Sequence, residues 1–294
     1  MEVSTAYLKS TEVGLRNNPK LKWVLTLLAT LLGIGLVFYF LPFGEIAKAL
    51  KQISPLHLAV GLSLYGVSYL LRAFRWKYYY PKAPFGGLFF TTAVNTFLNN
   101  LLPARLGELS IFALLRRYDP DFKTTLGKFL KVRLLDGFAL LTLFVLSLVA
   151  VKTNPLIGLL LSLVVYPLGI SFSKLLKVSE KIPSLDWEPL PFLLSVGALL
   201  AKLLAVYIVL ENLGLDFFRF TVGFLGGEVS TIMPIHSVAG IGSYETSFSL
   251  ALKLFLGESF KEGFAVGFLS HAFLLLGSTL FGLLSLPFAL RLLR

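Results

Sequence analysis

The chain of 294 residues contains no cysteine and only three histidines. Without cysteine, disulfide bonds, thiolate catalysis and cysteine-ligated metal sites are excluded. The histidines, His57, His236 and His271, lie too far apart in sequence to form an HExxH motif or a similar ligand pattern. No pair of nucleophile and base is recognisable either. We therefore expect a protein with no cofactor, no metal site and no enzymatic activity.

Acidic residues are also scarce, since the chain has 16 Asp and Glu against 27 Lys and Arg, a net charge of +11. In a soluble chain this excess would suggest nucleic-acid binding. Here, however, 56% of the residues are hydrophobic and the mean hydropathy is +0.79, whereas soluble domains are roughly 45–50% apolar. The basic residues collect between apolar runs, where they set orientation and contact anionic lipid. The composition predicts an all-α polytopic membrane protein that binds no nucleic acid.

A helix needs about 20 apolar residues to cross the bilayer core. About six stretches approach or reach this length and predict transmembrane helices at 22–41, 56–71, 128–151, 155–172, 191–210 and 263–290. A polar leader, residues 1–21, precedes the first of them and shows no small-residue cleavage pattern. We therefore expect the leader to stay in the cytoplasm rather than act as a cleaved signal.

Two further apolar stretches, 87–115 and 220–254, are interrupted by Pro and Gly and carry ionisable residues at the interruption. Each half has about fourteen residues or a little more, or roughly 21 Å of helix, which is too short to cross. We interpret each stretch as a re-entrant pair of half-helices. Paired broken segments, one in each half of a chain, point to a transporter binding site near the bilayer midplane.

Charge placement orients these segments, because Lys and Arg accumulate on the cytoplasmic side. With the leader inside, the next cytoplasmic loop is expected to hold Arg72, Arg75, Lys77 and Lys82. The first re-entrant pair then enters from the cytoplasm and the second from outside, and both termini are cytoplasmic in a multi-pass protein of the cell (inner) membrane. The chain divides into two halves of opposite orientation, 22–151 and 152–294, which predicts an inverted repeat.

Spacing supports this division. Glu108 precedes Arg133 by 25 residues, and Glu245 precedes His271 by 26. Each broken segment is therefore followed by a helix that carries an ionisable residue at a matching offset. Similar offsets are expected if the two halves share one fold.

The first break offers Asn99, Asn100, Arg105 and Glu108 as binding residues. Ionisable groups at membrane depth persist mainly for a site, a pathway or a partner. Pro and Gly at this break predict a helix N-terminus, whose free N–H groups favour an anion. Arg105 adds a guanidinium that can bind phosphate through two N–H groups.

Arg133 and Asp136 form a second candidate pair, because residues three apart share a helix face. One structural alternative is that this pair, and likewise Arg105 with Glu108, neutralises itself. Another is that all four charges form one network that joins the broken segment to its neighbour.

The second break offers Gly240, Gly242, Glu245 and His236. The glycines permit close approach or positive φ, and Ser243 can cap the next helix with Glu245 in its first turn. Glu245 is either a site residue or an acid that suits the helix dipole. His236 is either a proton-sensitive headgroup ligand or an interfacial histidine.

The sequence leaves the roles of two charged residues outside the breaks undecided. Lys202, in the 191–210 span, is either a pathway residue or a lysine that reaches the interface. Glu228 is a further buried acid that ranks below Glu245, and neither residue can be assigned from the sequence.

These motifs resemble a known family. The run Phe97-Leu-Asn-Asn-Leu-Leu-Pro-Ala-Arg-Leu-Gly-Glu108, then Arg133-Leu-Leu-Asp136, and Gly240-Ile-Gly-Ser-Tyr-Glu245 are similar to the lysylphosphatidylglycerol synthase transmembrane region family. This is the flippase-like domain of bacterial multiple peptide resistance factors. The resemblance covers nearly the whole chain and implies lipid translocation, with Arg105, Glu108, Arg133, Asp136, Gly242 and Glu245 at a polar central cavity. No soluble aminoacyl-transferase domain is present before the last residue, Arg294, so we expect no lipid synthesis by this chain.

Taken together, the sequence predicts a flippase that moves a phospholipid headgroup, such as aminoacylated phosphatidylglycerol, through a polar cavity at the midplane. Arg105 and Arg133 would hold the phosphate, while the acids hold an amine or balance the arginines. The alternatives are a transporter of another anionic cargo, such as polyprenyl phosphate, and an intramembrane lipid-modifying enzyme. Membrane phospholipids are the expected partners. A homo-oligomer, a separate lipid-synthesising enzyme, the energy source, any coupling ion and the direction of transport stay open.

Overall fold

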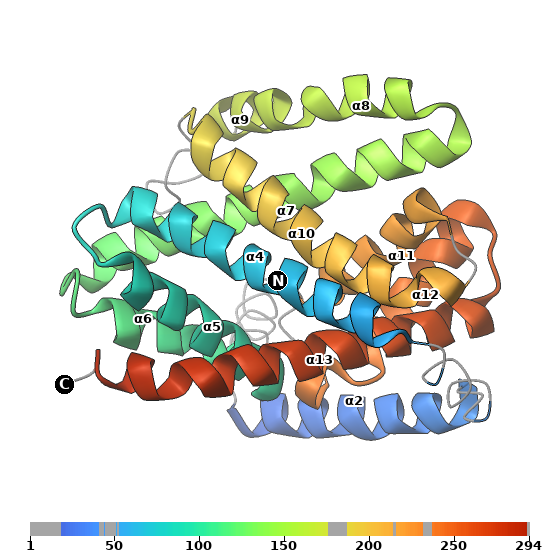
Figure 1. Cartoon of the computed structure of the whole chain (residues 1–294), viewed down its shortest axis with the longest axis horizontal. Helices are drawn as coiled ribbons and strands as arrows, with labels where there is room; N and C mark the ends of the chain where they lie inside the picture. The colour runs from blue at the N-terminus through green and yellow to red at the C-terminus, as the bar shows by residue number, and fades with distance from the viewer. Residues whose placement is uncertain are drawn as a thin grey trace, which may run out of the picture.

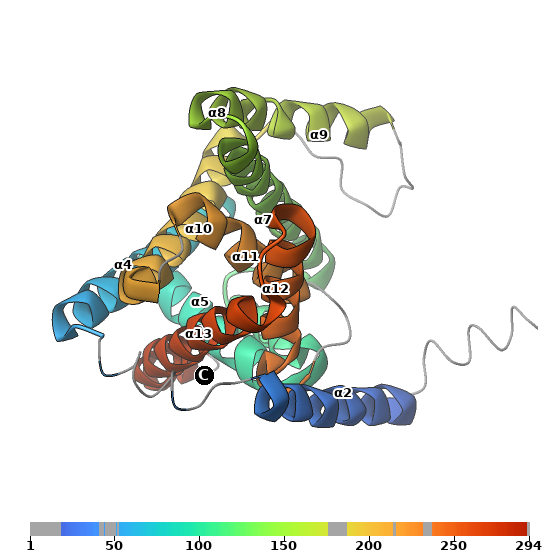
Figure 2. The same ribbon diagram turned by 90° about the vertical axis from the view of Figure 1, so that its right-hand side faces the viewer.

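The computed structural model describes residues 19–40, 44, 51, 53–175, 187–213, 216–231 and 237–292. Within these ranges the chain is helical and has no strand, so the prediction of an all-α protein is confirmed. In both views α8 and α9 lie at one edge of the molecule and α2 at the opposite edge (Figure 1, Figure 2). The helices are α2 (Pro19–Phe40), α4 (Pro55–Tyr79), α5 (Phe85–Leu101), α6 (Leu109–Leu115), α7 (Phe122–Lys152), α8 (Pro155–Leu163), α9 (Val165–Leu175), α10 (Pro189–Leu210), α11 (Phe217–Ser230), α12 (Ser243–Leu256) and α13 (Phe260–Leu290), with the short 3-10 helices η1 (Pro103–Glu108), η2 (Glu211–Leu213) and η3 (Val238–Gly240).

Helix starts follow the local chemistry of the sequence. A side-chain oxygen of the residue before the helix accepts a backbone N–H of the first turn, which satisfies donors that the helix itself leaves free. Proline fills the first helical position of α4 and α8, where its missing N–H costs nothing. The capping residues are Ser54, Asp121, Asn154, Asp216 and Ser259.

Four of the six expected spans are confirmed as long apolar helices. In the described residues α4, α7, α10 and α13 have 25, 31, 22 and 31 residues and are apolar enough to cross a bilayer. The expected span at 22–41 coincides with α2, which is helical but is not among these four.

The prediction of one continuous helix over 155–172 is wrong. The helix ends at Leu163, Val164 forms a turn, and α9 begins at Val165. Pro167 explains the break, because a proline has no N–H to donate to the carbonyl four residues earlier, which is that of Leu163. Neither α8, with 9 residues, nor α9, with 11, is long enough to cross a bilayer alone.

The expected loop after residue 71 is also wrong, because α4 continues to Tyr79 and carries Arg72, Arg75 and Lys77 within it. The helix packs along α10. Gly61 permits this contact, since a Cβ there would lie 2.4 Å from Val209 Cγ2. Arg72, Arg75 and Lys77 therefore belong to the last turns of a helix that packs on α10, and not to a loop.

Both apolar stretches with an interruption are broken helix pairs. In the first, α5 has 17 residues and is followed by η1 and the 7-residue α6. In the second, α11 and α12 have 14 residues each and are joined through η3. We call η1 the first break and the segment from η3 to Gly242 the second break. The two breaks meet, since η1 and η3 are in contact.

Each broken pair packs against a long helix from the other half of the chain. Helix α5 lies along α13, and α11 lies along α7. Close approach of α5 and α13 depends on Gly282, where a Cβ would lie 2.2 Å from Phe97 Cβ. On its outer face α13 exposes leucines, including Leu276, Leu283 and Leu284, whereas small residues such as Ser278 are buried on its inner face. This distribution suits a helix with lipid outside and protein inside.

Candidate functional site

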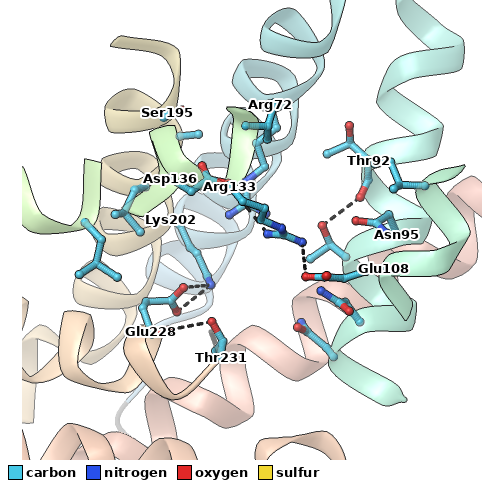
Figure 3. A pocket seen from close by; sticks show the side chains of 18 of the residues that line it. Arg72, Thr92, Asn95, Glu108, Arg133, Asp136, Ser195, Lys202, Glu228 and Thr231 are labelled. Carbon is cyan, nitrogen blue, oxygen red and sulfur yellow. Dashed lines mark hydrogen bonds and ion pairs between the residues drawn. The ribbon is translucent and has the colours of Figure 1, made fainter. Parts of the chain in front are cut away.

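A cavity of about 390 Å³ lies where the two breaks meet the long helices α4, α7, α10 and α13 (Figure 3). Four cationic side chains and three carboxylates line it, a surplus of one positive charge. Charges grouped in this way in the interior of a membrane protein mark a substrate or ion pathway. The polar lining residues are Arg72, Arg75, Thr92, Asn95, Thr96, Asn99, Asn100, Glu108, Arg133, Asp136, Ser195, Lys202, Glu228, Ser230, Thr231, Ser243 and His271.

Most of the candidate residues from the sequence meet in this cavity. Asn99, Asn100 and Glu108 reach it from the first broken pair, Arg133 and Asp136 from α7, and Gly240 from the second break. Gly242 and Glu245 lie directly behind the lining. His236 and the side chain of Arg105 fall outside the described residues, so their assigned roles stay predictions.

Glu108 and Arg133 form an ion pair across the cavity wall. Arg133 Nη2 donates to Glu108 Oε1 at 2.7 Å, and Arg133 Nη1 lies 4.0 Å from Asp136 Oδ2. The arginine also lies over the Phe129 ring, with its guanidinium carbon 5.0 Å from the ring centroid. Of the two structural alternatives, the described side chains therefore favour a network, because the pair joins the first break to α7.

Asp136 also pairs with Arg75, a residue that the sequence analysis placed in a loop. The Arg75 guanidinium donates to both carboxylate oxygens of Asp136 and to Ser195 Oγ on α10. Arg75 is only 3% exposed. Three long helices thus meet at one guanidinium, and the helical spacing of Arg72 and Arg75 was the signal in the sequence that could have revealed this.

Arg72 lies one turn before Arg75 on α4 and also lines the cavity (Figure 3). Among the described residues, none forms an ion pair or hydrogen bond with its guanidinium. The three other cations of the lining are paired: Arg75 with Asp136, Arg133 with Glu108, and Lys202 with Glu228. Arg72 therefore accounts for the surplus positive charge of the described lining.

Lys202 and Glu228 make a second strong pair that the sequence left open. Lys202 Nζ donates to both carboxylate oxygens of Glu228 at 2.7 Å. The ammonium also lies 5.9 Å from the Phe224 ring centroid. The pair joins α10 to α11, so each half of the chain has an ion pair between its broken segment and a long helix.

One face of α5 presents hydroxyl and amide groups to the cavity, at a helical spacing that brings Thr92, Asn95, Thr96, Asn99 and Asn100 together. Asn95 Nδ2 donates to Gly107 O and to Ser110 Oγ, both at 3.0 Å, and so fixes the first break. Asn100 Nδ2 donates to Ser278 Oγ on α13 at 2.9 Å. Asn99 Oδ1 is buried without a hydrogen-bond partner among the described residues, which leaves an acceptor for a bound molecule.

The second break depends on glycine, as the sequence predicted. Gly240 and Gly242 have φ values of 73° and 82°, a region that other residues rarely adopt. Gly242 also contacts α2, since a Cβ there would lie 2.1 Å from Gly33 Cα. Close by, the N–H of Val238 donates to Thr30 Oγ1 at 2.9 Å. Helix α2 is thereby attached to the second break by backbone contact.

The expected cap of α12 is only partly right. Gly242, not Ser243, precedes the helix, and its N–H donates to Glu245 Oε2 at 2.7 Å. Ser243 is the first helical residue, and its hydroxyl donates back to Gly240 O at 2.9 Å. Gly242 holds a positive φ that serine rarely adopts, which explains why the cap position falls one residue earlier.

The second oxygen of Glu245 reaches across to α13. Glu245 Oε1 lies 2.8 Å from His271 Nδ1, and the imidazole stacks on Tyr244 with centroids 4.7 Å apart. The two residues that the sequence matched by spacing in each half are therefore in direct contact in both halves. Sequence reasoning did not place His271 in the site, although its offset from Glu245 was noted.

No metal site is formed by the described side chains, since they contain no group of three His, Asp or Glu close enough to hold an ion. The arrangement can bind a phosphate or another anion at Arg72 and can hydrogen-bond a polar group along α5.

Comparison with known proteins gives one family match. Residues 23–282 match the family model described as the lysylphosphatidylglycerol synthase TM region. The match includes both broken helix pairs and every cavity residue named above. No match was found among curated proteins.

Proposed function

Because this multi-pass membrane chain belongs to the lysylphosphatidylglycerol synthase TM region family, we propose that it moves the headgroup of a phospholipid between leaflets through the central cavity. The observation that carries the proposal is Arg72, a cation that lines the cavity and has no carboxylate partner among the described residues. An unpaired guanidinium in a low-dielectric site is costly without an anion. A lipid phosphate supplies that anion and accepts two parallel N–H bonds from one arginine.

The paired charges have a different part in this proposal. Arg75, Arg133 and Lys202 are already neutralised by carboxylates, so they shape the cavity and hold its walls together. Arg133 is more accessible to a ligand than Arg75, because its side chain is 34% exposed against 4% for Arg75. We propose that Arg72 binds the phosphate and that Arg133 and Arg105 assist when the lipid enters.

The polar face of α5 suits the remainder of a headgroup. Two of its amide donors are used within the protein, since Asn95 and Asn100 donate through Nδ2 to described residues. Carbonyl oxygens such as Asn99 Oδ1 are left to accept from hydroxyl or ammonium groups of the lipid. The acyl chains would remain in the bilayer, where the outer faces of the helices are apolar.

The arrangement of helices supports an inverted repeat with re-entrant pairs. If α4, α5, α6 and α7 correspond to α10, α11, α12 and α13, the packing of α5 on α13 corresponds to that of α11 on α7. Glu108 with Arg133 then corresponds to Glu245 with His271. Backbone breaks at membrane depth are tolerated where they line a water-filled cavity. We propose that the two pairs enter from opposite faces and that both termini are cytoplasmic.

The direct test is reconstitution into liposomes that contain fluorescent phospholipids of different headgroups, with translocation followed by quenching of the outer leaflet. Arg72→Gln should lower the rate at least about tenfold, since a hydrogen bond to a charged group contributes about 1.5–3 kcal/mol. Arg116→Gln, on an exposed arginine away from the cavity, is the matched control. Equal rates for wild type and Arg72→Gln would reject the phosphate site.

Two other outcomes separate the alternatives. Movement of a polyprenyl phosphate but of no phospholipid would assign the same phosphate chemistry to a different carrier lipid. Recovery of chemically altered lipid with an unchanged distribution between leaflets would indicate an intramembrane enzyme. This result would contradict the expectation that the protein has no enzymatic activity.

A further inference from the structure

The two matched ion pairs differ in one chemical property. Glu108 is paired with Arg133, which stays charged at any physiological pH. Glu245 is paired with His271, whose side chain changes charge between about pH 5 and 8 when unperturbed. The first break is therefore joined to α7 by a permanent cation, whereas the second break is joined to α13 by a titratable one.

The second pair controls the backbone of its break directly. Glu245 Oε2 accepts the N–H of Gly242, and Glu245 Oε1 contacts His271 Nδ1. One carboxylate thus connects the last residue of the break to α13. Glu245 is 1% exposed, whereas the His271 side chain is 10% exposed and lines the cavity. Of the two described partners, the histidine is the one that lines the cavity, so it is the nearer to a proton in cavity water.

The second ring nitrogen of His271, Nε2, is placed to receive a proton from the cavity. No described residue forms a hydrogen bond with Nε2. Gly240 lies next to this edge of the ring and has no side chain there. A Cβ at this position would lie 3.1 Å from Nε2 and 2.9 Å from Cε1. The glycine therefore leaves Nε2 open toward the cavity that both residues line.

The charged and titratable groups around His271 come from several elements. Helix α12 contributes Glu245 and Tyr244, α11 contributes Glu228, α10 contributes Lys202, and α4 contributes Arg72 and Tyr65. Lys202 and Glu228 neutralise each other. Glu245 is the one group of this set in hydrogen-bond contact with the ring.

We propose that His271 and Glu245 form the binding site of a coupling proton, so that protonation at the second break drives the translocation proposed above. A proton from cavity water binds His271 Nε2, and the imidazolium donates through Nδ1 to Glu245 Oε1 as one half of a charge pair. Loss of the proton to water returns a neutral ring and weakens the link between the second break and α13. The first break, held by an arginine, does not respond. This inference rests on the proposed function.

Lipid translocation at imposed pH gradients tests the coupling. In proteoliposomes, the wild-type rate should rise as the pH is lowered, because the proposal has protonation of His271 drive translocation. His271→Gln should remove this dependence, whereas His57→Gln should keep it, since His57 pairs with Glu211 outside the cavity lining. An unchanged pH dependence in His271→Gln would overturn the coupling.

A direct measurement keeps the proton site testable if His271→Gln does not fold. The chain has only three histidines, so NMR of histidine-labelled wild-type protein can assign the His271 signal by comparison with His57→Gln and His236→Gln. The ring should change protonation state in a pH titration of the wild-type protein, and Glu245→Gln should change the pH at which it does. A ring with one fixed protonation state overturns the proposal. Absence of lipid movement at every pH with a titrating ring would instead reject the proposed function and leave the proton site in place.

Discussion

Lys202 donates from one ammonium to both carboxylate oxygens of Glu228, at 2.7 Å each, and so connects α10 to α11 in the interior. Both side chains are nearly closed to solvent, with 12% and 10% of their surface exposed. When a charge is removed from water to this degree, loss of its partner strongly destabilises the folded protein. The pair is therefore a suitable place to measure what a buried pair of permanent charges contributes to stability.

Glu228→Gln should lower the free energy of unfolding by about 3–5 kcal/mol, because it leaves the Lys202 ammonium buried without a counter-charge. Lys202→Met together with Glu228→Met should recover most of this loss, since no uncompensated charge remains. Denaturant titration of the detergent-solubilised protein gives both values. A double variant as unstable as Glu228→Gln would show that the loss arises from packing and not from charge.

Gly107→Ala should destabilise the first break. A Cβ at this position would lie 2.2 Å from Asn99 N and 2.3 Å from Leu98 C, so the backbone of α5 would have to move. Overpacking of this kind costs about 1–3 kcal/mol or more. Gly127→Ala in α7 is the matched control, because nothing lies within 4 Å of its Cβ and alanine is favoured over glycine in a helix by about 1 kcal/mol. Thermal unfolding should therefore shift in opposite directions for the two variants.

Asp136→Asn should weaken the junction of α4, α7 and α10. It leaves the buried Arg75 guanidinium without a carboxylate among the described side chains, with the neutral amide oxygen and Ser195 as its acceptors. The expected loss lies below the about 3–5 kcal/mol of a fully buried pair, because the Asp136 side chain is 36% exposed. Ser195→Ala should cost less still, since the charge pair survives. A larger loss for Ser195→Ala than for Asp136→Asn would contradict this order.

The inverted arrangement predicts that the starts of α7 and α13 face opposite sides of the membrane. The chain has no cysteine, so Lys123→Cys and Lys261→Cys each introduce a single reactive thiol without any background. In intact cells, a membrane-impermeant maleimide should label Lys261→Cys and not Lys123→Cys. Labelling of both residues from the same side would refute the inverted repeat.

Much of the fold follows from the sequence because apolar length and Pro or Gly interruptions have direct physical consequences. A run of about 20 apolar residues has few alternatives to a helix in lipid. The breaks were equally visible, since proline removes a donor and glycine permits positive φ, as Gly240 and Gly242 do. The sequence could not place α4 beyond residue 71, because charge density there resembles that of a loop. Arg75 is buried where α4 packs on α10, and it bonds to Asp136 of α7 and Ser195 of α10.

The site could be predicted only in part, because ion pairs between distant segments are set by packing. Arg133 and Asp136 were recognised as a pair by their spacing, yet each has its closer partner elsewhere, in Glu108 and Arg75. Arg72 was expected in a cytoplasmic loop and not in the site, since its lack of a partner among the described residues is visible only when its neighbours are placed. Composition can indicate that charges are buried, but not which of them remains available to a ligand.

Helix α2 contacts both breaks, through η1 and η3, and otherwise mainly α13 within the described chain. On its outer side Leu31 and Leu32 are exposed. A rearrangement of either break would therefore shift α2 as a unit relative to the long helices. A spectroscopic label on this outer surface would report the state of the cavity from outside the protein, without any substitution at the residues proposed to bind the headgroup.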